Sequence, residues 1–446
     1  MLKAKYTISV LLLAGLLLGA STAFAQGKIT IELNMGQERP RLAVPDFAAA
    51  NPDPQTGPLN TVFNQTLWND LENAGIFDIV AKSFYPVQPP GQPSQVNVST
   101  WGNPPPNAGL LAFGNLGVNA GKVDVQGWLV DVKNAGAPPI LGKQYREDAN
   151  EGNARLIAHR FADEIIARIG GGIPGIAESK IFFISTRSGN KEVWSMDYDG
   201  NSQQQLTHTG SIALSPRISP DRSRLAFSVL TKDSWQIMMY SLDLGRTVSF
   251  PRYSGDNISP AWSSDGSKLA FSSSMHQGSS NIFVADASGA GSRRLSTGQT
   301  DVSPVFNPKT NGQIAFVSGR TGLPQIYVMD ADGSNVQKIT DQGYAVSPSW
   351  SPNGLLLAFA WNRKYGPGVV GGWDIYIMEI ASHQIVQLTH DSGRNDFPSW
   401  SPDGRHIVFQ SNRGGTEEIW SVLADGSHLQ QLTHQGRNTQ PNWSYQ

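Results

Sequence analysis

The chain has no cysteine among its 446 residues. This absence excludes disulfides, thiolate zinc sites, iron–sulfur centres and a cysteine nucleophile. It also excludes a lipoprotein-type anchor, which needs a cysteine at its cleavage site. The net charge is also small, because 34 Lys and Arg nearly balance 36 Asp and Glu and leave −2. A strongly basic surface for nucleic acid is therefore not expected.

Long apolar runs are also lacking, apart from one near the start of the chain. Ile8 to Leu18 follows Lys3 and Lys5 and precedes the small-residue site Ala23 to Ala25. This pattern predicts a secretory signal peptide over residues 1–25, cut before Gln26. A membrane anchor is the alternative, but the run is shorter than the roughly 20 residues that span a bilayer. We therefore expect a soluble, exported protein of the bacterial periplasm.

Glycine (46) and proline (28) are plentiful, whereas charged residues make up only 16%. This composition predicts a globular chain with many turns and a bias toward β-structure. At this length, about three domains are expected.

A repeat of 44 residues organises the second half of the chain. A Ser-Pro pair recurs at Ser215, Ser259, Ser303 and Ser347. Phe397-Pro398 follows 50 residues later, and Gln440-Pro441 another 43 residues on. The longer interval contains a loop insertion at Lys364 to Gly368.

Each repeat holds four short segments in the same order. A Ser-Pro-x-Trp-Ser-x-Asp-Gly segment, as at 259–266, precedes an apolar run such as 269–271. An alternating run such as 326–330 and an Asp-Gly turn follow, and the last segment ends in Leu-Thr, as at 388–389. Units of four strands and 40–50 residues are typical of β-propeller blades.

The first and second segments each occur six times. The earliest second segment is Ile181 to Ile184, and the latest first segment is Pro441 to Ser444. The chain is therefore predicted to enter the ring at a second strand and to close it with its last strand. We expect a six-bladed β-propeller over residues 173–446.

Two recurrent features have a structural and a functional interpretation. A tryptophan stands at one repeat position, at Trp262, Trp350, Trp400 and Trp443. Packing between blades is favoured over a ligand-binding aromatic ring. The segments 197–200 and 330–333 resemble the start of a calcium loop but lack its full set of twelve residues, so hairpin turns are favoured.

Residues 26–172 lack the repeat and predict a small α/β domain. Helical spacing occurs over Asn60 to Ala74 and over Asn153 to Ile169. The stretch Gln88 to Pro106 is rich in proline and glycine and predicts a loop. Strands are expected at 41–47, 76–80, 123–132 and 142–146.

Motifs of catalysis are missing. The linker Gly170 to Gly175 matches G-x-G-x-x-G, but a helix precedes it and a strand follows, which is the wrong order for a dinucleotide site. The chain has no G-x-S-x-G, H-E-x-x-H or P-loop motif. His208, His390 and His434 each follow a repeat's Leu-Thr, where surface positions are favoured over a metal-binding ring. We expect binding rather than catalysis, with no catalytic residue, cofactor or metal.

Three features together resemble the TolB family, the periplasmic components of the Tol–Pal envelope system. They are the helix segment Ile157 to Ile165 leading through the Gly-rich linker, the segment Asn69 to Phe77, and the propeller repeats behind an N-terminal domain. The Pro-rich stretch 88–106 departs from the family pattern, which leaves its local geometry open.

The resemblance implies a monomeric, non-enzymatic periplasmic adaptor with no nucleic-acid partner and no direct membrane insertion. Its propeller would bind the peptidoglycan-associated lipoprotein Pal, and its N-terminus would bind TolA, in support of outer-membrane integrity and constriction during division. The matching TolA-binding segment comprises Gln26, Lys28, Ile29, Ile31, Leu33 and Glu38. The stretch 28–33 alternates, which suits strand addition to a partner or docking on its own domain.

For Pal we look to the loops that precede each Ser-Pro strand, where charged and aromatic residues gather on a rigid scaffold. These residues are Tyr253, Asp256, Asp301, Tyr344, Arg394, Asp396, Arg437 and Asn438. The competing classes are a periplasmic glycan-binding propeller and a polysaccharide lyase. Exposed channel-mouth aromatics would favour the first, and clustered His, Tyr, Arg or metal ligands in the channel would favour the second.

Overall fold

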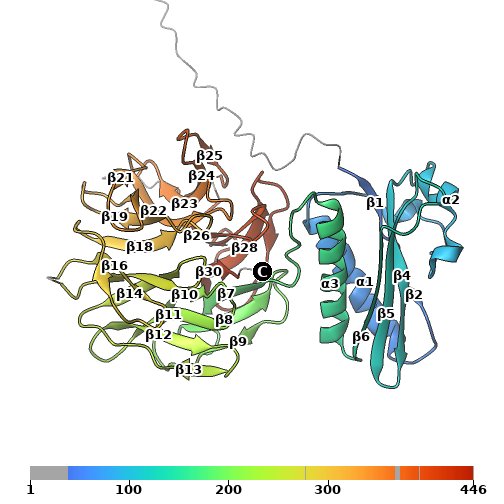
Figure 1. Cartoon of the computed structure of the whole chain (residues 1–446), viewed down its shortest axis with the longest axis horizontal. Coiled ribbons are helices and arrows are strands. Elements are labelled where there is room, and N and C mark those ends of the chain that lie inside the picture. The colour runs from blue at the N-terminus through green and yellow to red at the C-terminus, as the bar shows by residue number, and fades with distance from the viewer. Residues whose placement is uncertain (1–38, 277, 367–371, 391, 445–446) are drawn as a thin grey trace, which may run out of the picture.

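The computed structural model describes residues 39–276, 278–366, 372–390 and 392–444, which form an α/β domain and a β-propeller (Figure 1). The predicted signal peptide and the predicted TolA-binding segment lie outside the described residues. Within these ranges, no helix is long and apolar enough to cross a membrane.

The N-terminal domain is built on one mixed sheet of order β3-β1-β4-β5-β6, with β2 paired to β4. Strand β1 is parallel to both neighbours, whereas β4, β5 and β6 form an antiparallel meander. The strands are β1 (Arg41–Ala43), β2 (Ala48–Ala49), β3 (Asp78–Ile79), β4 (Leu110–Asn119), β5 (Lys122–Asp131) and β6 (Leu141–Asp148).

Two long helices cover the face of the sheet that is turned toward the propeller (Figure 1). They are α1 (Thr56–Asn73) and α3 (Glu151–Ile169), and they bury one apolar stripe each against the sheet. Gly127 of β5 is needed where the sheet passes under Phe161, because a Cβ there would lie 2.7 Å from the ring. The two predicted helices are confirmed, each beginning a few residues earlier than expected.

The N-terminal domain departs from prediction in two places. Strand β4, the middle of the sheet, was not anticipated. The Pro-rich stretch 88–106 is not a plain loop, because it contains η2 (Pro93–Gln95) and α2 (Val98–Gly102) and follows η1 (Lys82–Phe84). Trp101 of α2 is buried beside Phe113 of β4 in a second apolar cluster, so this stretch covers the sheet.

The second domain is a ring of six four-stranded antiparallel sheets, as predicted. We number the blades from the one that contains β7. Blade 1 is β30 (Asn438–Trp443), β7 (Lys180–Ser185), β8 (Glu192–Asp197) and β9 (Gln204–Gln205). Blade 2 is β10 (Ala213–Ile218), β11 (Arg224–Leu230), β12 (Trp235–Ser241) and β13 (Arg246–Val248). Blade 3 is β14 (Asn257–Trp262), β15 (Lys268–Ser273), β16 (Asn281–Asp286) and β17 (Arg293–Arg294).

The remaining three blades follow the same order of strands from the channel outward. Blade 4 is β18 (Asp301–Phe306), β19 (Gln313–Ser318), β20 (Gln325–Asp330) and β21 (Gln337–Lys338). Blade 5 is β22 (Tyr344–Trp350), β23 (Leu356–Asn362), β24 (Asp374–Glu379) and β25 (Ile385–Gln387). Blade 6 is β26 (Asn395–Trp400), β27 (His406–Ser411), β28 (Glu418–Leu423) and β29 (Gln430–Gln431).

The propeller core lies between blades rather than within them. Each of its six apolar clusters joins residues of two neighbouring blades. The repeated tryptophans are between 3% and 6% exposed, which confirms that they pack between blades. A blade alone would leave both apolar faces in water, so the blades stabilise one another.

The Leu-Thr ending of the repeats has a structural reason. The hydroxyl of the Thr accepts a hydrogen bond from the backbone N–H of the third strand, as Thr340 does from Ile326 at 2.9 Å. The same hydroxyl donates to a buried polar side chain, Gln325 in this blade. The pair therefore fixes the short fourth strand to the third.

The ring is closed by β30, the last described strand, which pairs antiparallel with β7 in blade 1 as predicted. Trp443 sits in the apolar cluster between blades 1 and 6, and its indole N–H donates to Ser179 at 2.7 Å. One β-strand from the end of the chain thus completes a blade that begins more than 250 residues earlier.

Every first strand carries a β-bulge at the residue before its proline. These residues have φ between +52° and +55°, a left-handed conformation that side-chain-bearing residues seldom adopt. They are Ser215, Ser259, Ser303, Ser347, Phe397 and Gln440. The bulge bends each first strand along the channel wall.

Candidate functional site

The propeller has two faces with different partners. The first strands begin on one face, together with the loops from second to third strands, and we call it the entry face. They end on the other face, together with the turns from third to fourth strands, which we call the turn face. The N-terminal domain is docked on the turn face of blades 1 and 6, through Tyr198 and Asp199 of one turn and Arg405 and His406 beside another.

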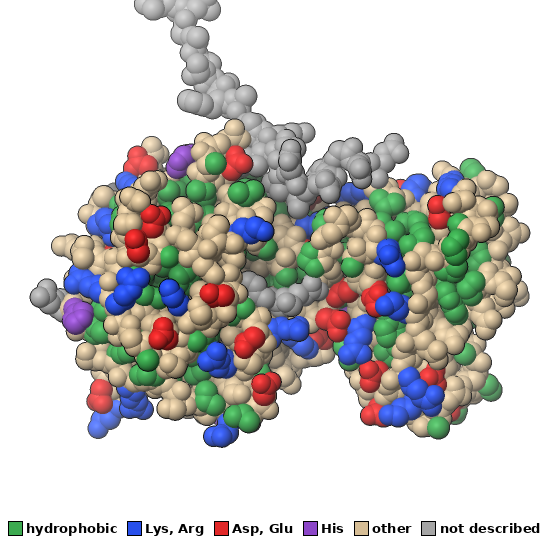
Figure 2. Space-filling view, viewed as in Figure 1, with side chains coloured by type: hydrophobic (Ala, Val, Ile, Leu, Met, Phe, Trp, Pro, Cys, Tyr) green, Lys and Arg blue, Asp and Glu red, His purple; other side chains and the backbone are tan. Residues whose placement is uncertain are grey.

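A buried polar network links the two domains, and we call it the junction network. Oδ2 of Asp70 on α1 lies 2.7 Å from Nδ1 of His159 on α3. The Tyr198 hydroxyl of the propeller donates to the other Asp70 oxygen at 2.7 Å. Arg155 of α3 donates to Asp199 of the propeller at 2.6 Å. Lys, Arg, Asp and Glu side chains also gather along this boundary at the surface (Figure 2).

Burial and charge set the protonation behaviour of the network. Burial raises the pKa of Asp70, against the opposing effect of His159. Burial alone would lower the pKa of His159, but the Asp70 carboxylate outweighs it and the pKa of His159 is raised. Burial opposes ionisation of Asp199, yet Arg155 and His159 hold its pKa below the usual value. The junction network is therefore a compensated set of charges.

A second contact lies at the end of α1. Nε2 of His406 is 2.9 Å from the backbone oxygen of Asn73, and its Nδ1 is 3.1 Å from Asp403. Gly75 has φ +64°, and a Cβ there would lie 2.8 Å from Leu423. The last turn of α1 therefore fits closely against blade 6.

His159, Asp197 and Asp199 together could offer metal ligands by position. Asp199 already pairs with Arg155, and Asp197 with Lys180, so cationic side chains occupy the places of an ion. The turn 197–200 is a hairpin between β8 and β9, as predicted. His208, His390 and His434 are exposed.

The loop residues predicted to bind Pal divide into two groups. Asp301, Asp396 and Asn438 are at most 2% exposed. Asp301 pairs with Arg320 at 3.0 Å, Asp396 accepts from Ser347 at 2.8 Å, and Asn438 donates to Glu418 at 2.7 Å. These three hold the blades in place, so the structure does not present them to a partner.

The other predicted residues lie at or near the surface. Asp256, Arg394 and Arg437 are exposed, and Arg437 pairs with Glu417 at 2.8 Å. Tyr344 is half-buried. Tyr253 stacks on Phe271 with centroids 5.1 Å apart, and burial raises the pKa of its hydroxyl. It therefore packs against blade 3 rather than reaching outward.

An aromatic group with one arginine stands out on the entry face of blades 5 and 6. Tyr344 contacts Tyr365 and Trp373 at centroid distances of 5.3 and 5.2 Å. The guanidinium of Arg394 lies 4.9 Å from the Trp373 ring. Tyr365, from the inserted loop, is 45% exposed. We call these four residues the aromatic cluster.

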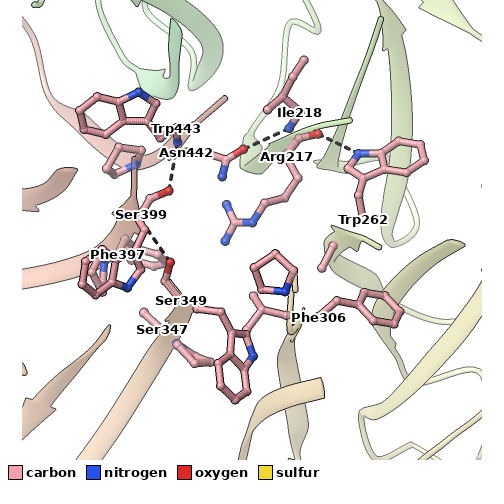
Figure 3. Close-up of a pocket in the computed structure, with 18 of the residues that line it drawn as sticks. Arg217, Ile218, Trp262, Phe306, Ser347, Ser349, Phe397, Ser399, Asn442 and Trp443 are labelled. Atoms are coloured by element: carbon pink, nitrogen blue, oxygen red, sulfur yellow. Dashed lines mark hydrogen bonds between the residues drawn. The ribbon is translucent and has the colours of Figure 1, made fainter. Parts of the chain in front are cut away.

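The central channel is hollow between the bulges and the turn face (Figure 3). Its wall alternates prolines, tryptophans and small polar side chains. Among the described residues that line this cavity, Arg217 carries the one charge, and there is no His, Tyr, Asp or Glu.

Sequence reasoning missed the junction network and Arg217. Asp70 and His159 interrupt the apolar faces of two predicted helices, and both fall in segments that carry the family resemblance. Arg217 stands at a repeat position that holds small or uncharged residues in the other blades. In both cases a polar residue in an apolar or neutral pattern was the available signal.

Comparisons with known proteins agree with this architecture. A family model described as the TolB beta propeller domain matches residues 169–367 and 342–446, and the TolB amino-terminal domain matches residues 28–137. A TolB homolog of Chlorobium luteolum is 36% identical over 219 residues, or 49% of this chain and 48% of that protein. The Tol-Pal system protein TolB of Desulfosudis oleivorans is 32% identical over 291 residues, or 64% of each chain.

The alignments therefore span less than two thirds of these relatives' own lengths. The crystal structure of TolB from Acinetobacter baumannii has a TM-score of 0.76 at 21% identity and covers 92% of this chain and 98% of that one, which shows the shared fold.

A six-bladed propeller with an α/β domain docked on one face is thus the class to which the molecule belongs. Within that class, the chain belongs to the TolB family.

Proposed function

We propose that the chain is a non-enzymatic periplasmic adaptor of the Tol–Pal system. The membership of both domains in the TolB family is the observation that carries this proposal. The adaptor binds the lipoprotein Pal through the propeller and TolA through residues 26–38. In this way it supports outer-membrane integrity and envelope constriction during cell division.

The Pal surface is proposed on the entry face, centred on the aromatic cluster. Tyrosine, tryptophan and arginine carry most of the binding energy in protein interfaces. Trp373 contacts both Tyr344 and Arg394, so these side chains lose little freedom on binding. The N-terminal domain occupies the opposite face, which leaves the entry face of the described structure uncovered by it.

Calorimetric titration with the soluble domain of the same organism's Pal tests this surface. We expect saturable one-to-one binding. A double change of Tyr344 and Arg394 to Ala should weaken it by about tenfold or more. The control is Arg246→Ala, an exposed arginine on the outer strand β13. Equal losses in both variants, or none in either, would place the site elsewhere.

The TolA contact is proposed for the segment that precedes Arg39. Arg39 lies close enough to Arg405 and Asp425 to influence their pKa values, so the described chain begins beside the domain junction. Docking and release of this segment would couple the two partners. Deleting residues 26–38 should abolish TolA binding and change the affinity for Pal. Unchanged affinities for both would refute the coupling.

A glycan-binding or lyase propeller is the alternative function. A lyase would require acid–base or metal-ligating groups in the channel, and Arg217 is the one ionisable residue in the described lining. A titration with oligosaccharides that shows binding, while Pal gives none, would reverse the order of the two proposals.

A further inference from the structure

The entry face of blades 6 and 1 carries four arginines in two equivalent pairs. In each pair, one arginine directly precedes the first strand, and the other lies in the loop between the second and third strands. The pairs are Arg394 with Arg413 in blade 6 and Arg437 with Arg187 in blade 1. We call these four residues the arginine row.

One repeated loop geometry brings each pair together. The backbone oxygen of the first arginine accepts a hydrogen bond from the residue just before the second arginine. This residue is Asn412 in blade 6, at 3.3 Å from Arg394, and Thr186 in blade 1, at 3.1 Å from Arg437. The two arginines of a pair therefore start from adjoining points of the backbone.

The propeller fold does not require this pattern. At the same two positions, blade 3 has Asp256 and Met275, and blade 4 has Thr300 and Arg320. All six blades nevertheless have the same order of four strands. In blade 4, moreover, the carboxylate of Asp301 pairs directly with Arg320 at 3.0 Å.

An asparagine takes the place of that aspartate in blades 6 and 1. Arg413 donates to Asn395 at 2.9 Å, and Arg187 donates to Asn438 at 3.2 Å. An amide oxygen keeps the hydrogen bond without bringing a negative charge. The positive charge of these guanidinium groups is therefore compensated less directly than that of the equivalent arginine in blade 4.

The carboxylates behind the row are buried. Asp374 and Glu418 accept from the two asparagines at 3.2 and 2.7 Å, and both are at most 7% exposed. Asp396, which contacts the other arginine of blade 6 at 3.3 Å, is buried as well. Burial lowers the pKa of Arg187 and of Arg413, and the carboxylates oppose this only in part. The negative charge thus lies inside the blades, and the positive charge lies nearer the surface.

Charge in the loops of the entry face is distributed unequally around the ring. In the described loops of blades 5, 6 and 1, Glu417 is the one acid, and it pairs with Arg437. The same loops hold seven cations, Arg363, Lys364, Arg394, Arg413, Arg437, Arg187 and Lys191. The described loops of blades 2, 3 and 4 are balanced, with Lys232, Arg252 and Arg320 against Asp233, Asp256 and Asp341.

Three of the four guanidinium groups lie on indole rings, which fixes the planes of their N–H groups. The pairs, at 4.9, 5.0 and 4.7 Å from guanidinium to ring, are Arg394 with Trp373, Arg413 with Trp420 and Arg187 with Trp194. Guanidinium groups held in this way suit paired hydrogen bonds to carboxylates. Because Trp373 also belongs to the aromatic cluster, the row continues the surface proposed for Pal.

We propose that the protein bound at the entry face presents an acidic surface to the arginine row, which steers it onto the neighbouring aromatic cluster. This inference rests on the proposed binding of Pal and names the chemistry of the surface that Pal uses. The carboxylates of the partner supply the charge that Asp301 supplies within blade 4. Steering by opposite charges raises association rates by about 10- to 1,000-fold and weakens as salt is added.

Stopped-flow association of the full mature chain with the soluble domain of Pal tests the row. Raising the ionic strength from about 0.01 to 0.15 M shortens the screening length from roughly 30 to 8 Å. We expect the association rate constant to fall by about tenfold or more, while the dissociation rate constant changes by less than about twofold. Tyr344→Ala, in the aromatic cluster, should act mainly on the dissociation rate constant.

A pair of double variants separates the row from general attraction. Arg413→Gln with Arg437→Gln removes one charge from each arginine pair and should slow association at low salt by about fivefold or more. The control, Lys232→Gln with Arg252→Gln, removes two exposed charges from the opposite side of the same face and should stay within about twofold. Arg437→Gln alone, at an exposed position, should show part of the effect even if the double variant fails to fold.

The outcomes distinguish this inference from the proposed function. Failure of Pal to bind at all would refute both. Binding of Pal with an association rate that ignores salt, or with equal slowing in the row and control variants, would overturn the inference and leave the proposed function standing. Alginate, a polysaccharide of carboxylates, is the second probe. Salt-independent association of Pal, together with alginate binding that the row variant loses, would assign the row to an anionic glycan instead.

Discussion

The interfaces between blades and the interface between the two domains are built from different kinds of side chain. Blades meet through apolar clusters that contain tryptophan and phenylalanine, such as Trp443 between blades 1 and 6. The two domains meet through a polar network in which Asp70 contacts His159 and Tyr198. Apolar burial involves no change of protonation, whereas the stability of a network of charges depends on the protonation state of its members.

This difference suggests how the molecule could respond to partners without unfolding. The ring requires all six blades, so its parts cannot separate one by one. The domain junction can lose its contacts while each domain keeps its own apolar core. Changes at the closing strand, at the domain junction, at a bulge and at a buried carboxylate should therefore affect stability in different ways.

Deleting Pro441 to Gln446 should have the largest effect, because it removes the second half of the closing strand, Trp443 included. Trp443→Ala alone should cost about 3–5 kcal/mol, and the deletion should cost more since it also opens the ring. Urea unfolding measures both. Leu355→Ala, at a residue that is 59% exposed, is the control and should stay within about 0.5 kcal/mol. A deletion variant as stable as the control would show that the pairing of β30 with β7 does not hold the ring closed.

Asp70→Asn should weaken the domain junction by about 3 kcal/mol, because it removes the carboxylate that faces buried His159. Calorimetry should show the propeller transition at its original temperature and an earlier transition for the N-terminal domain. Proteolysis within the linker 170–175 should accelerate. Glu72→Gln, an exposed change on the same helix, is the control. A single transition shifted as a whole would show that the two interfaces are coupled.

Ser303→Val should destabilise the propeller by about 1–2 kcal/mol more than Ser303→Gly, because a β-branched residue tolerates the left-handed conformation poorly. The φ of Ser303 is +54° in its bulge. Thermal unfolding of the pair measures the difference. Equal stabilities would mean that the strand can straighten without disturbing the blade interfaces.

Asp163 should make the segment between the two domains sensitive to pH. Burial raises the pKa of Asp163 on α3 to about 7, against hydrogen bonds from the backbone of Ala177 and Glu178, just after the linker. Because the folded pKa lies above the unfolded one, the contribution to stability is full below about pH 4 and is lost as the pH rises through 7. The melting temperature of Asp163→Asn should therefore fall less between pH 5 and 8 than that of the parent. Parallel curves would contradict this assignment.

The propeller could be predicted from sequence because its signals are local and repeated. The Ser-Pro pairs, the tryptophan and the Leu-Thr endings each mark a strand, and six copies define the ring. Strand β4 could not be predicted in this way. It occurs once, it is buried along most of its length, and Gly114 and Gly117 interrupt its pattern.

The junction network was hidden for a different reason. Asp70 is separated by 89 residues from His159 and by 128 from Tyr198, so only the docked fold brings them together. The buried loop residues show the converse. Asp301 is a charged residue of the kind expected on a surface loop, but it is buried and pairs with Arg320. A charged residue in a predicted loop is therefore exposed only if the fold gives it no oppositely charged partner.

The closing strand also sets a condition on assembly. Lys180 N–H meets Ser444 Oγ across 264 residues, so ring closure must wait until every other blade has been made. Until then β7 is an open strand edge, able to accept the equivalent strand of another copy. At high concentration, the strand pairing that closes one ring could therefore join two molecules as a strand-exchanged dimer.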